Sequence, residues 1–352
     1  MVPIVIGGPK LFLDRLTVAL EKLEIEAFQI VNPGKNFQDD IQRDKLTIAR
    51  LDGVYYYKMT SQNFFNFIRQ RKLVDINTIK YLPNSILEKF TFLLNFYLNR
   101  FNRKLITRSD ALVFQSNLSL EMHKKFMGDE FSNKMYAVIL NGVPTKLFYP
   151  KKNGIELNGS PCLVITASFR PHKRLHEAIK IINQLKINHP SCILHVIGVV
   201  DHITKENISH LNCDNVIFHG VVDSYLLPDY YASCDVGLSP SLFDPCPNSV
   251  VEMMACGVPV ITTKESGASE LVRNSDLIIE EDVNFGYMEL QTIEKLPQLN
   301  IDQWCATIEK VIDNYEYYSE AMLLRVEREL DIDIVASKYA DFIKKVSDNV
   351  SR

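Results

Sequence analysis

Two carboxylates stand eight positions apart, at Asp244 and Glu252, around the predicted start of a short helix. Prolines interrupt the chain before this helix, which Asn248 or Ser249 can cap. A loop that opens onto a helix N-terminus attracts phosphate, because unpaired N–H groups and the helix dipole both point outward. One carboxylate can then bind sugar hydroxyls and the other ribose hydroxyls, with a diphosphate between them. The alternative is that both acids are only solvated.

Three cations follow a predicted strand in the segment Phe169 to Leu175, before a helix predicted over Leu175 to Leu185. When a bond between a sugar and a diphosphate breaks, negative charge develops on the leaving oxygen, and fixed cations stabilise it. Arg170 and Lys173 are therefore candidate catalytic cations, and Arg174 is a candidate donor-binding cation. A solvated helix start would give a similar pattern.

The elements that position these residues alternate between strand-like apolar runs and helical patterns, which predicts an α/β fold with parallel sheets covered by helices. Pro, Gly, Asn and charged residues concentrate near 146–160, which predicts a boundary between domains at 1–146 and 147–332. We expect strands near 4–6, 27–31, 111–115, 136–140, 162–167, 193–197, 216–218, 236–239, 258–262 and 277–280.

The segment from Asp244 to Val260 resembles the acidic motif of retaining glycosyltransferases of family 4, also called glycosyltransferase group 1. In that motif two carboxylates separated by seven residues precede a small-residue helix, Gly-x-Pro and a strand. The resemblance covers about residues 107 to 280. It implies the GT-B fold, in which two Rossmann-like domains face each other across a cleft, and a last helix, here at about 333–352, packs back onto the first domain. Other family landmarks match in order at 141–143 with Phe148, 215–220, 227–236 and 267–270.

The resemblance implies retaining transfer of a hexose from a UDP- or GDP-sugar to a glycan or a lipid-linked acceptor. Its phosphate clamp usually has an Arg five residues before the Lys, where this chain has Ser168. The first carboxylate is usually Glu, and Asp244 is shorter by one methylene. The catalytic residues that we expect are Arg170, Lys173, Asp244 and Glu252, and the donor-binding residues are Gly8, Arg174, His219, Gly220, Asn248, Ser249 and Val250.

The N-terminal half offers fewer candidates. The pair Gly7-Gly8 follows the first predicted strand, Arg15 lies two turns into the next helix, and Asp52 follows a predicted strand end. We expect Gly7, Arg15 and Asp52 to contact the acceptor or the donor sugar. Family members often carry a donor-contacting His in this half, but the first His here is His123, which we place on a helix surface.

Other features limit cofactors and location. No Asp-x-Asp metal motif accompanies the predicted site, so we expect no metal and no cofactor beyond the nucleotide-sugar substrate. Seven cysteines, all from Cys162 onward, lack metal-like spacing and are expected as reduced core residues. The start lacks a signal-like pattern and no apolar run approaches the roughly 18 residues of a membrane span, so we expect a cytoplasmic protein.

A basic, aromatic segment at about 64–108 has nine Lys or Arg residues against two acids between positions 69 and 108. It suits an anionic membrane surface on the inner face of the membrane or a phosphorylated acceptor. The alternative is a buried helix with a solvated basic face. The segment lacks any recognisable nucleic-acid-binding module, so we expect no nucleic-acid partner.

Two other functions remain open from the residues. A phosphorylase or epimerase of the same fold would use the same clamp but other catalytic groups, which we do not find. A non-catalytic GT-B subunit that acts as a scaffold in glycan assembly would agree with the missing His and with Asp at position 244.

Overall fold

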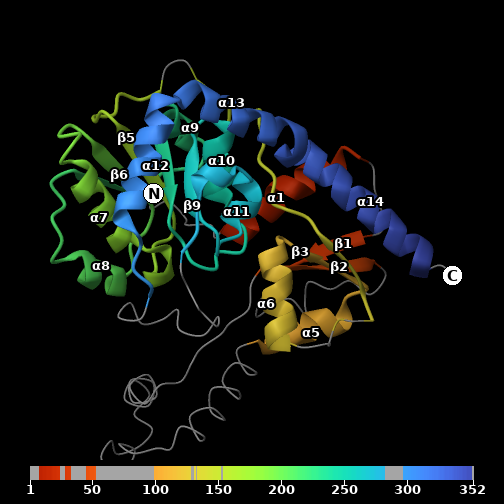
Figure 1. Cartoon of the computed structure of the whole chain (residues 1–352). Helices are drawn as coiled ribbons and strands as arrows, with labels where there is room; N and C mark the ends of the chain where they lie inside the picture. Colours follow the sequence, from red (N-terminus) through yellow and green to blue (C-terminus); the bar gives the residue numbers. More distant parts are fainter. Residues whose placement is uncertain are drawn as a thin grey trace, which may run out of the picture.

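The computed structural model describes residues 8–23, 28–32, 45–52, 99–127, 131, 133–151, 154–281 and 296–350. These residues form two parallel sheets, each covered by helices (Figure 1). The predicted strand at 4–6, Gly7 and most of the basic segment at 64–108 lie outside the described residues.

The N-terminal sheet contains four described strands in the order β1-β2-β3-β4, all parallel. Every residue of the β3 run Ala-Leu-Val-Phe is buried, as expected for a parallel strand that is covered on both faces. The strands are β1 (Phe28–Val31), β2 (Leu46–Leu51), β3 (Ala111–Phe114) and β4 (Met135–Val138).

The C-terminal sheet contains six described strands in the order β10-β9-β8-β5-β6-β7, also parallel. The strand order reverses between β5 and β8, and ligands of such sheets bind outside the strand ends at this switch point. The strands are β5 (Cys162–Thr166), β6 (Ile193–Ile197), β7 (Val216–Gly220), β8 (Val236–Ser239), β9 (Val260–Thr263) and β10 (Ile278–Ile279).

Helices cover both sheets (Figure 1). The N-terminal set is α1 (Gly8–Glu21), α5 (Arg100–Arg108) and α6 (Asn117–Met127). The C-terminal set is η2 (Pro171–Lys173), α7 (Leu175–Leu185), α8 (His202–Ile208), α9 (Leu227–Tyr231), α10 (Asn248–Ala255), α11 (Ala268–Val272), η3 (Ser275–Leu277), α12 (Ile301–Asp313), α13 (Tyr315–Arg325) and the π-helical η5 (Val326–Leu330).

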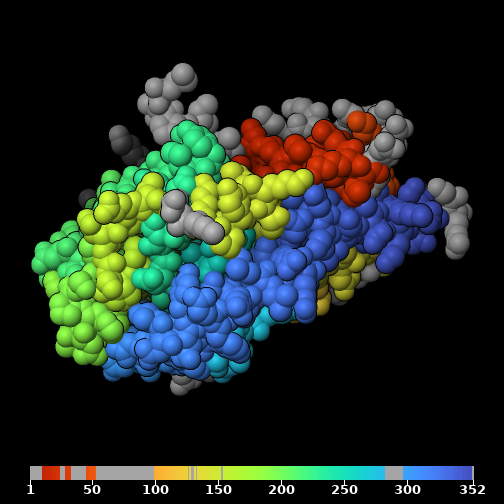
Figure 2. All heavy atoms as spheres, turned by 90° about the horizontal axis from the view of Figure 1, so that it is seen from above, coloured from red at the N-terminus to blue at the C-terminus, as the bar shows by residue number. Residues whose placement is uncertain are grey.

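The last helix, α14 (Ile332–Val350), returns to the N-terminal sheet and lies beside α1 (Figure 2). Its buried face includes Tyr339 and Phe342, in one apolar cluster with Phe12 and Leu16 of α1. Two segments connect the halves of the molecule, and they bond to each other. The Val143 N–H donates to the Leu330 carbonyl at 2.9 Å, and the Ile332 N–H donates to the Val143 carbonyl at 2.9 Å.

The seven cysteines are free thiols; six are buried, as predicted, and Cys213 is half-buried. Among the described helices, none is long and apolar enough to cross a membrane.

Candidate functional site

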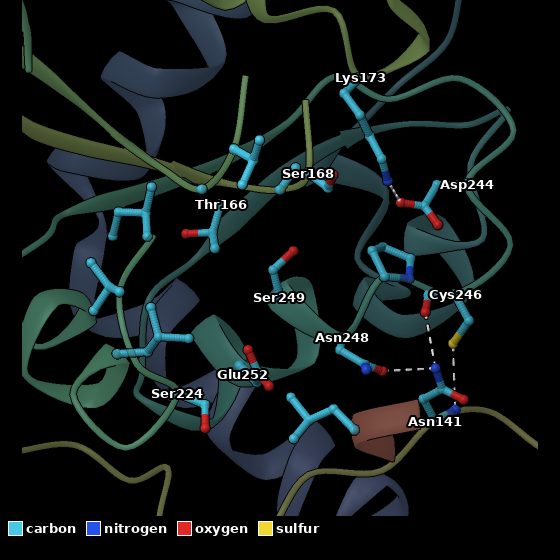
Figure 3. Close-up of a pocket in the computed structure, with 18 of the residues that line it drawn as sticks. Asn141, Thr166, Ser168, Lys173, Ser224, Asp244, Cys246, Asn248, Ser249 and Glu252 are labelled. Atoms are coloured by element: carbon cyan, nitrogen blue, oxygen red, sulfur yellow. Dashed lines mark hydrogen bonds and ion pairs between the residues drawn. The ribbon is translucent and has the colours of Figure 1, made fainter. Parts of the chain in front are cut away.

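A cavity of about 680 Å³ opens where the carboxyl ends of strands from both sheets meet (Figure 3). The C-terminal sheet contributes the residues that follow β5, β6, β7 and β8, and the N-terminal sheet contributes Asp52, Gln115 and Asn141. Pockets of roughly 300–1,000 Å³ hold small organic ligands. The described lining is Leu11, Asp52, Gln115, Asn141, 166–168, Lys173, 197–199, 221–225, Leu227, 244–249 and Glu252.

The loop before α10 is held tightly against the next turn. The Gly267 N–H donates to the Asp244 carbonyl at 2.8 Å, and a Cβ at Gly267 would lie 1.8 Å from the Pro245 carbonyl oxygen. Phe243 adopts a left-handed backbone with φ of 51°, which turns the chain just before Asp244. This backbone conformation fixes the position of Asp244 at the cavity edge.

The N-terminus of α10 faces the same cavity. The predicted side-chain cap is wrong, because the N-cap residue is Pro247 and no side chain caps the helix. Asn248 is instead the first helical residue, and its Oδ1 accepts a 2.8 Å hydrogen bond from Asn141 Nδ2. Asn248 and Ser249 both line the cavity, and Ser249 points into it (Figure 3). Gly257 ends the helix region with φ of 80°, as predicted.

Lys173 and Asp244 form an ion pair at one side of the cavity (Figure 3). Lys173 is the last residue of the η2 turn after β5, and Asp244 belongs to the loop after β8. The switch in strand order therefore brings together two predicted catalytic residues that are 71 positions apart.

Glu252 lies one turn inside α10, lines the cavity and pairs with Arg15 of α1 at 2.6 Å. Burial raises the pKa of the Glu252 carboxyl, and the Arg15 guanidinium lowers it in part. Arg15 does not line this cavity, so the predicted contact of Arg15 with an acceptor or sugar is replaced here by a contact with Glu252.

Arg50, fully buried on β2, organises the floor of the cavity. It pairs with Asp52, and its Nη2 donates to Gln115 Oε1 at 2.8 Å and to Asn141 Oδ1 at 2.7 Å. Because Asn141 also binds Asn248, this network joins the N-terminal sheet to the start of α10. Removal from bulk water raises the pKa of the Asp52 carboxyl, against the effect of Arg50.

The structure does not bring Arg170 or Arg174 into the cavity. Arg170 is exposed, outside the described lining. Arg174 is fully buried and holds Glu281 with two hydrogen bonds of 2.5 and 3.0 Å, and it also donates to the Pro297 carbonyl at 2.7 Å. Its left-handed backbone, with φ of 53°, turns the chain from η2 into α7 and directs the side chain away from Lys173. Only Lys173 of the three predicted cations lines the cavity.

Four other predicted donor contacts, at His219, Gly220, Val250 and Gly8, are also absent from the described lining. The His219 ring stacks on His195, and the Nε2 of His219 lies 2.8 Å from Nδ1 of His195. Gly220 is exposed at the end of β7, and Val250 is fully buried in the C-terminal core. Gly8 is the first residue of α1, and Gly7 lies outside the described residues.

The predicted surface position of His123 is wrong. The side chain is fully buried against Phe114, and burial lowers the pKa of its imidazole to about 4. Its Nδ1 lies 2.7 Å from the carbonyl oxygen of Ser119, one turn earlier on α6.

The carboxylate of Glu270, which follows the turn at Gly267, reaches the other half of the molecule. It accepts three hydrogen bonds of 2.8 Å from the N-terminus of α6, two from Asn117 and one from the Leu118 N–H. A carboxylate at a helix N-terminus is stabilised by the free N–H groups and the dipole there.

Sequence reasoning missed the apolar wall of the cavity and its buried amides. Val199, Val221 and Tyr225 line the cavity, and Tyr225 is 60% exposed. Gln115 and Asn141 lie at or just after strand ends, and this position was the one available signal for them. In the part of the chain that the structure describes, no group of three or more His, Cys, Asp or Glu residues could hold a metal ion.

Comparisons with known proteins relate part of this chain to a protein family. Residues 149–285 match a protein-family model described as glycosyl transferases group 1. No curated protein matches the sequence significantly.

Solved structures resemble the whole chain at low sequence identity. A sucrose-phosphate synthase from Thermosynechococcus elongatus is 15% identical with a TM-score of 0.61, over 98% of this chain and 81% of that one. A glycosyltransferase from Rickettsia africae is 18% identical with a TM-score of 0.56, over 99% and 84%. HepE from Anabaena, solved with UDP-glucose, is 14% identical with a TM-score of 0.54, over 97% and 82%. The chain therefore has the GT-B fold, and its C-terminal half carries the group 1 glycosyltransferase pattern.

Proposed function

We propose that this protein is a glycosyltransferase that moves a hexose from a UDP- or GDP-sugar to a glycan or lipid-linked acceptor, with retention. One observation carries the proposal. The cavity brings together Lys173, two carboxylates and the uncapped N-terminus of α10. These groups complement the diphosphate and the hydroxyls of a nucleotide-sugar.

The donor has a natural orientation in this cavity. Lys173 and the first N–H groups of α10 offer positive potential for the diphosphate. Glu252, buried beyond them, can accept from ribose hydroxyls, and Asp244 can accept from the sugar. The exposed ring of Tyr225, with Val199 and Val221, offers an apolar surface of the kind that a nucleobase can stack on.

The comparisons support UDP as the nucleotide to test first. Solved structures of similar fold are described as complexes with UDP, with UDP and glucose, and with UDP-glucose. We therefore infer a UDP-hexose as the donor.

The chemistry that we propose requires little of the protein beyond positioning. As the bond to the sugar breaks, charge grows on the diphosphate, and Lys173 with the α10 N–H groups would stabilise it. The departing phosphate would accept the proton of the acceptor hydroxyl on the same face of the sugar, which preserves the configuration. Asp52 also lines the cavity and would contact the acceptor or the sugar.

The alternative, a non-catalytic scaffold, is favoured by one observation. Lys173 is neutralised by Asp244, and the usual second cation of the clamp is Ser168. Transfer of labelled hexose from UDP-sugars to lipid-linked and glycan acceptors distinguishes the two functions. We expect Glu252→Gln to lower kcat/KM by about 100-fold, since hydrogen bonds to charged groups contribute about 1.5–3 kcal/mol.

The matched control is Glu280→Gln, which changes an exposed carboxylate outside the cavity lining and should leave transfer unchanged. Transfer by the Glu252→Gln variant at the wild-type rate would refute the assigned site. Absence of transfer with all donors by a folded wild-type protein would favour the scaffold.

A further inference from the structure

We propose that Arg15 is a positioning residue for Glu252. Arg15 holds one oxygen of the Glu252 carboxylate, so that the other oxygen can accept a hydrogen bond from a hydroxyl of the donor. The donor site would then be completed by a side chain from the other half of the molecule. This role rests on the proposed function.

The geometry of the pair is that of a buried, directed contact. Arg15 Nη1 lies 2.6 Å from Glu252 Oε1, and the two side chains are 11% and 5% exposed. The guanidinium carbon of Arg15 lies 5.1 Å from the centre of the Phe148 ring, which fixes the plane of the cation from a third element. Arg15 therefore has little freedom to leave Glu252.

The two oxygens of Glu252 have different surroundings. Oε1 accepts from Arg15, whereas none of the described residues donates a hydrogen bond to Oε2. Glu252 lines the large cavity, and Arg15 lines a separate cavity of about 230 Å³ on the other side of the pair. Arg15 thus approaches the carboxylate from the side that a donor would not occupy.

The electrostatics of the pair explain why this partner is needed. Among the described residues, three ionisable groups interact with Glu252: Arg15 from α1, the Tyr231 hydroxyl from α9 and the Cys256 thiol at the end of α10. Burial raises the pKa of Tyr231 well above its usual value and that of Cys256 to about 12, so both stay neutral near pH 7. Arg15 is therefore the cation that opposes protonation of the buried Glu252 carboxyl.

The same pair connects the two halves of the molecule. Arg15 belongs to α1, which packs against α14, and Glu252 belongs to α10 of the C-terminal half. Separation of the halves would remove the partner of Glu252 and favour its neutral form. A complete donor site therefore requires that the halves stay together.

Calorimetric titration of the full chain with UDP-glucose, UDP-N-acetylglucosamine and UDP-galactose between pH 5 and 8 tests this role. Wild-type affinity should fall as the pH drops through the raised pKa of Glu252, because the ionised form accepts the donor hydroxyl. In Arg15→Met the pKa of Glu252 rises further. The acid limb of the pH profile, where donor affinity falls as the pH drops, should therefore move to higher pH by about one unit or more. At pH values below the pKa of Glu252 in both proteins, the affinity of Arg15→Met should then lie about tenfold or more below that of the wild type.

Arg15→Lys keeps the charge and should keep the acid limb at the wild-type position, and it remains informative if Arg15→Met does not fold. In a Glu252→Gln background, Arg15→Met should cause no further shift with pH. The role of Arg15 would be overturned, and the proposed function would not, by either of two results. One is an acid limb in Arg15→Met at the wild-type position, and the other is an acid limb in Arg15→Lys that moves as in Arg15→Met. A wild-type protein that binds no nucleotide-sugar would instead overturn the proposed function, and this role with it.

Discussion

The two sheets contribute to the cavity in different ways. The C-terminal sheet supplies backbone and charge directly at its strand ends, with Lys173 after β5, Asp244 after β8 and the start of α10. The N-terminal sheet supplies a buried network under the cavity, in which Arg50 binds Asp52, Gln115 and Asn141.

This difference separates groups that would bind the donor from groups that would hold the binding groups in place. The C-terminal groups are encoded in short strand-loop-helix segments and would contact the donor directly. The N-terminal groups act through contacts across the interface, as Asn141 does on Asn248 and Arg15 on Glu252. Changes in the two regions should therefore have different signatures in binding and in stability.

Two neighbouring cations give the largest contrast. Arg174→Met should lower the free energy of unfolding by about 3–5 kcal/mol, because it leaves the buried Glu281 without its partner. It should leave the affinity for the donor within about twofold, since Arg174 does not line the cavity. Urea unfolding together with donor titration measures both quantities, and a large loss of affinity at unchanged stability would show that the assignment is wrong.

Lys173→Met should have the opposite signature. We expect donor affinity to fall by about 10- to 100-fold, because a charge-assisted contact to the diphosphate is lost. The half-buried Lys173–Asp244 pair should contribute only modestly to stability. Titration with free UDP and with uridine separates the effects, since only UDP should lose affinity. An equal loss for uridine would place the diphosphate elsewhere.

Arg50→Met tests the supporting network. We expect a loss of about 1–3 kcal/mol in the free energy of unfolding at pH 7.5, because Asp52, Gln115 and Asn141 lose a common donor. The pKa of Asp52 is already raised by burial and should rise further without Arg50. A raised pKa in the folded state gives stability that is present at low pH and lost as the pH rises, so the deficit should be smaller at pH 5. A deficit that grows toward pH 5 would contradict this account.

Glu270→Gln should have the smallest effect. The half-buried carboxylate accepts from Asn117 and Leu118 at the start of α6, and such contacts contribute about 0.3–1 kcal/mol. Hydrogen exchange should show faster exchange confined to the first turn of α6. Glu121→Gln, which changes an exposed carboxylate on the same helix, is the control. Equal effects of the two changes would show that the contact of Glu270 does not stabilise the start of α6.

The local part of the structure could be predicted from the sequence. The strands at 193–197 and 236–239 and the helix at 175–185 have the predicted limits, because their apolar runs are continuous and have clear ends. The positions of Lys173, Asp244 and Glu252 at one cavity were predictable for the same reason, since each belongs to a short segment whose pattern predicts its position at a strand end or helix start.

The directions of side chains were not predictable in this way. The turn of η2 and the left-handed backbone at Arg174 decide which of the three cations at positions 170, 173 and 174 faces the cavity. The partner of Glu252 lies 237 positions away, and nothing in the local pattern of α1 indicates it. His123 was misplaced because one polar residue on an amphipathic helix can face either way, and packing against Phe114 decides.

The central claim is that this cavity binds a nucleotide-sugar through groups from both halves of the molecule. The most direct measurement is isothermal titration of the wild-type protein, Lys173→Met and Glu252→Gln with UDP-glucose and with other UDP-, GDP- and ADP-hexoses. The account predicts saturable binding of one UDP-hexose by the wild type and a loss of about tenfold or more in each variant. Binding that is unchanged in both variants, or no binding of any nucleotide-sugar by the folded wild type, would contradict it.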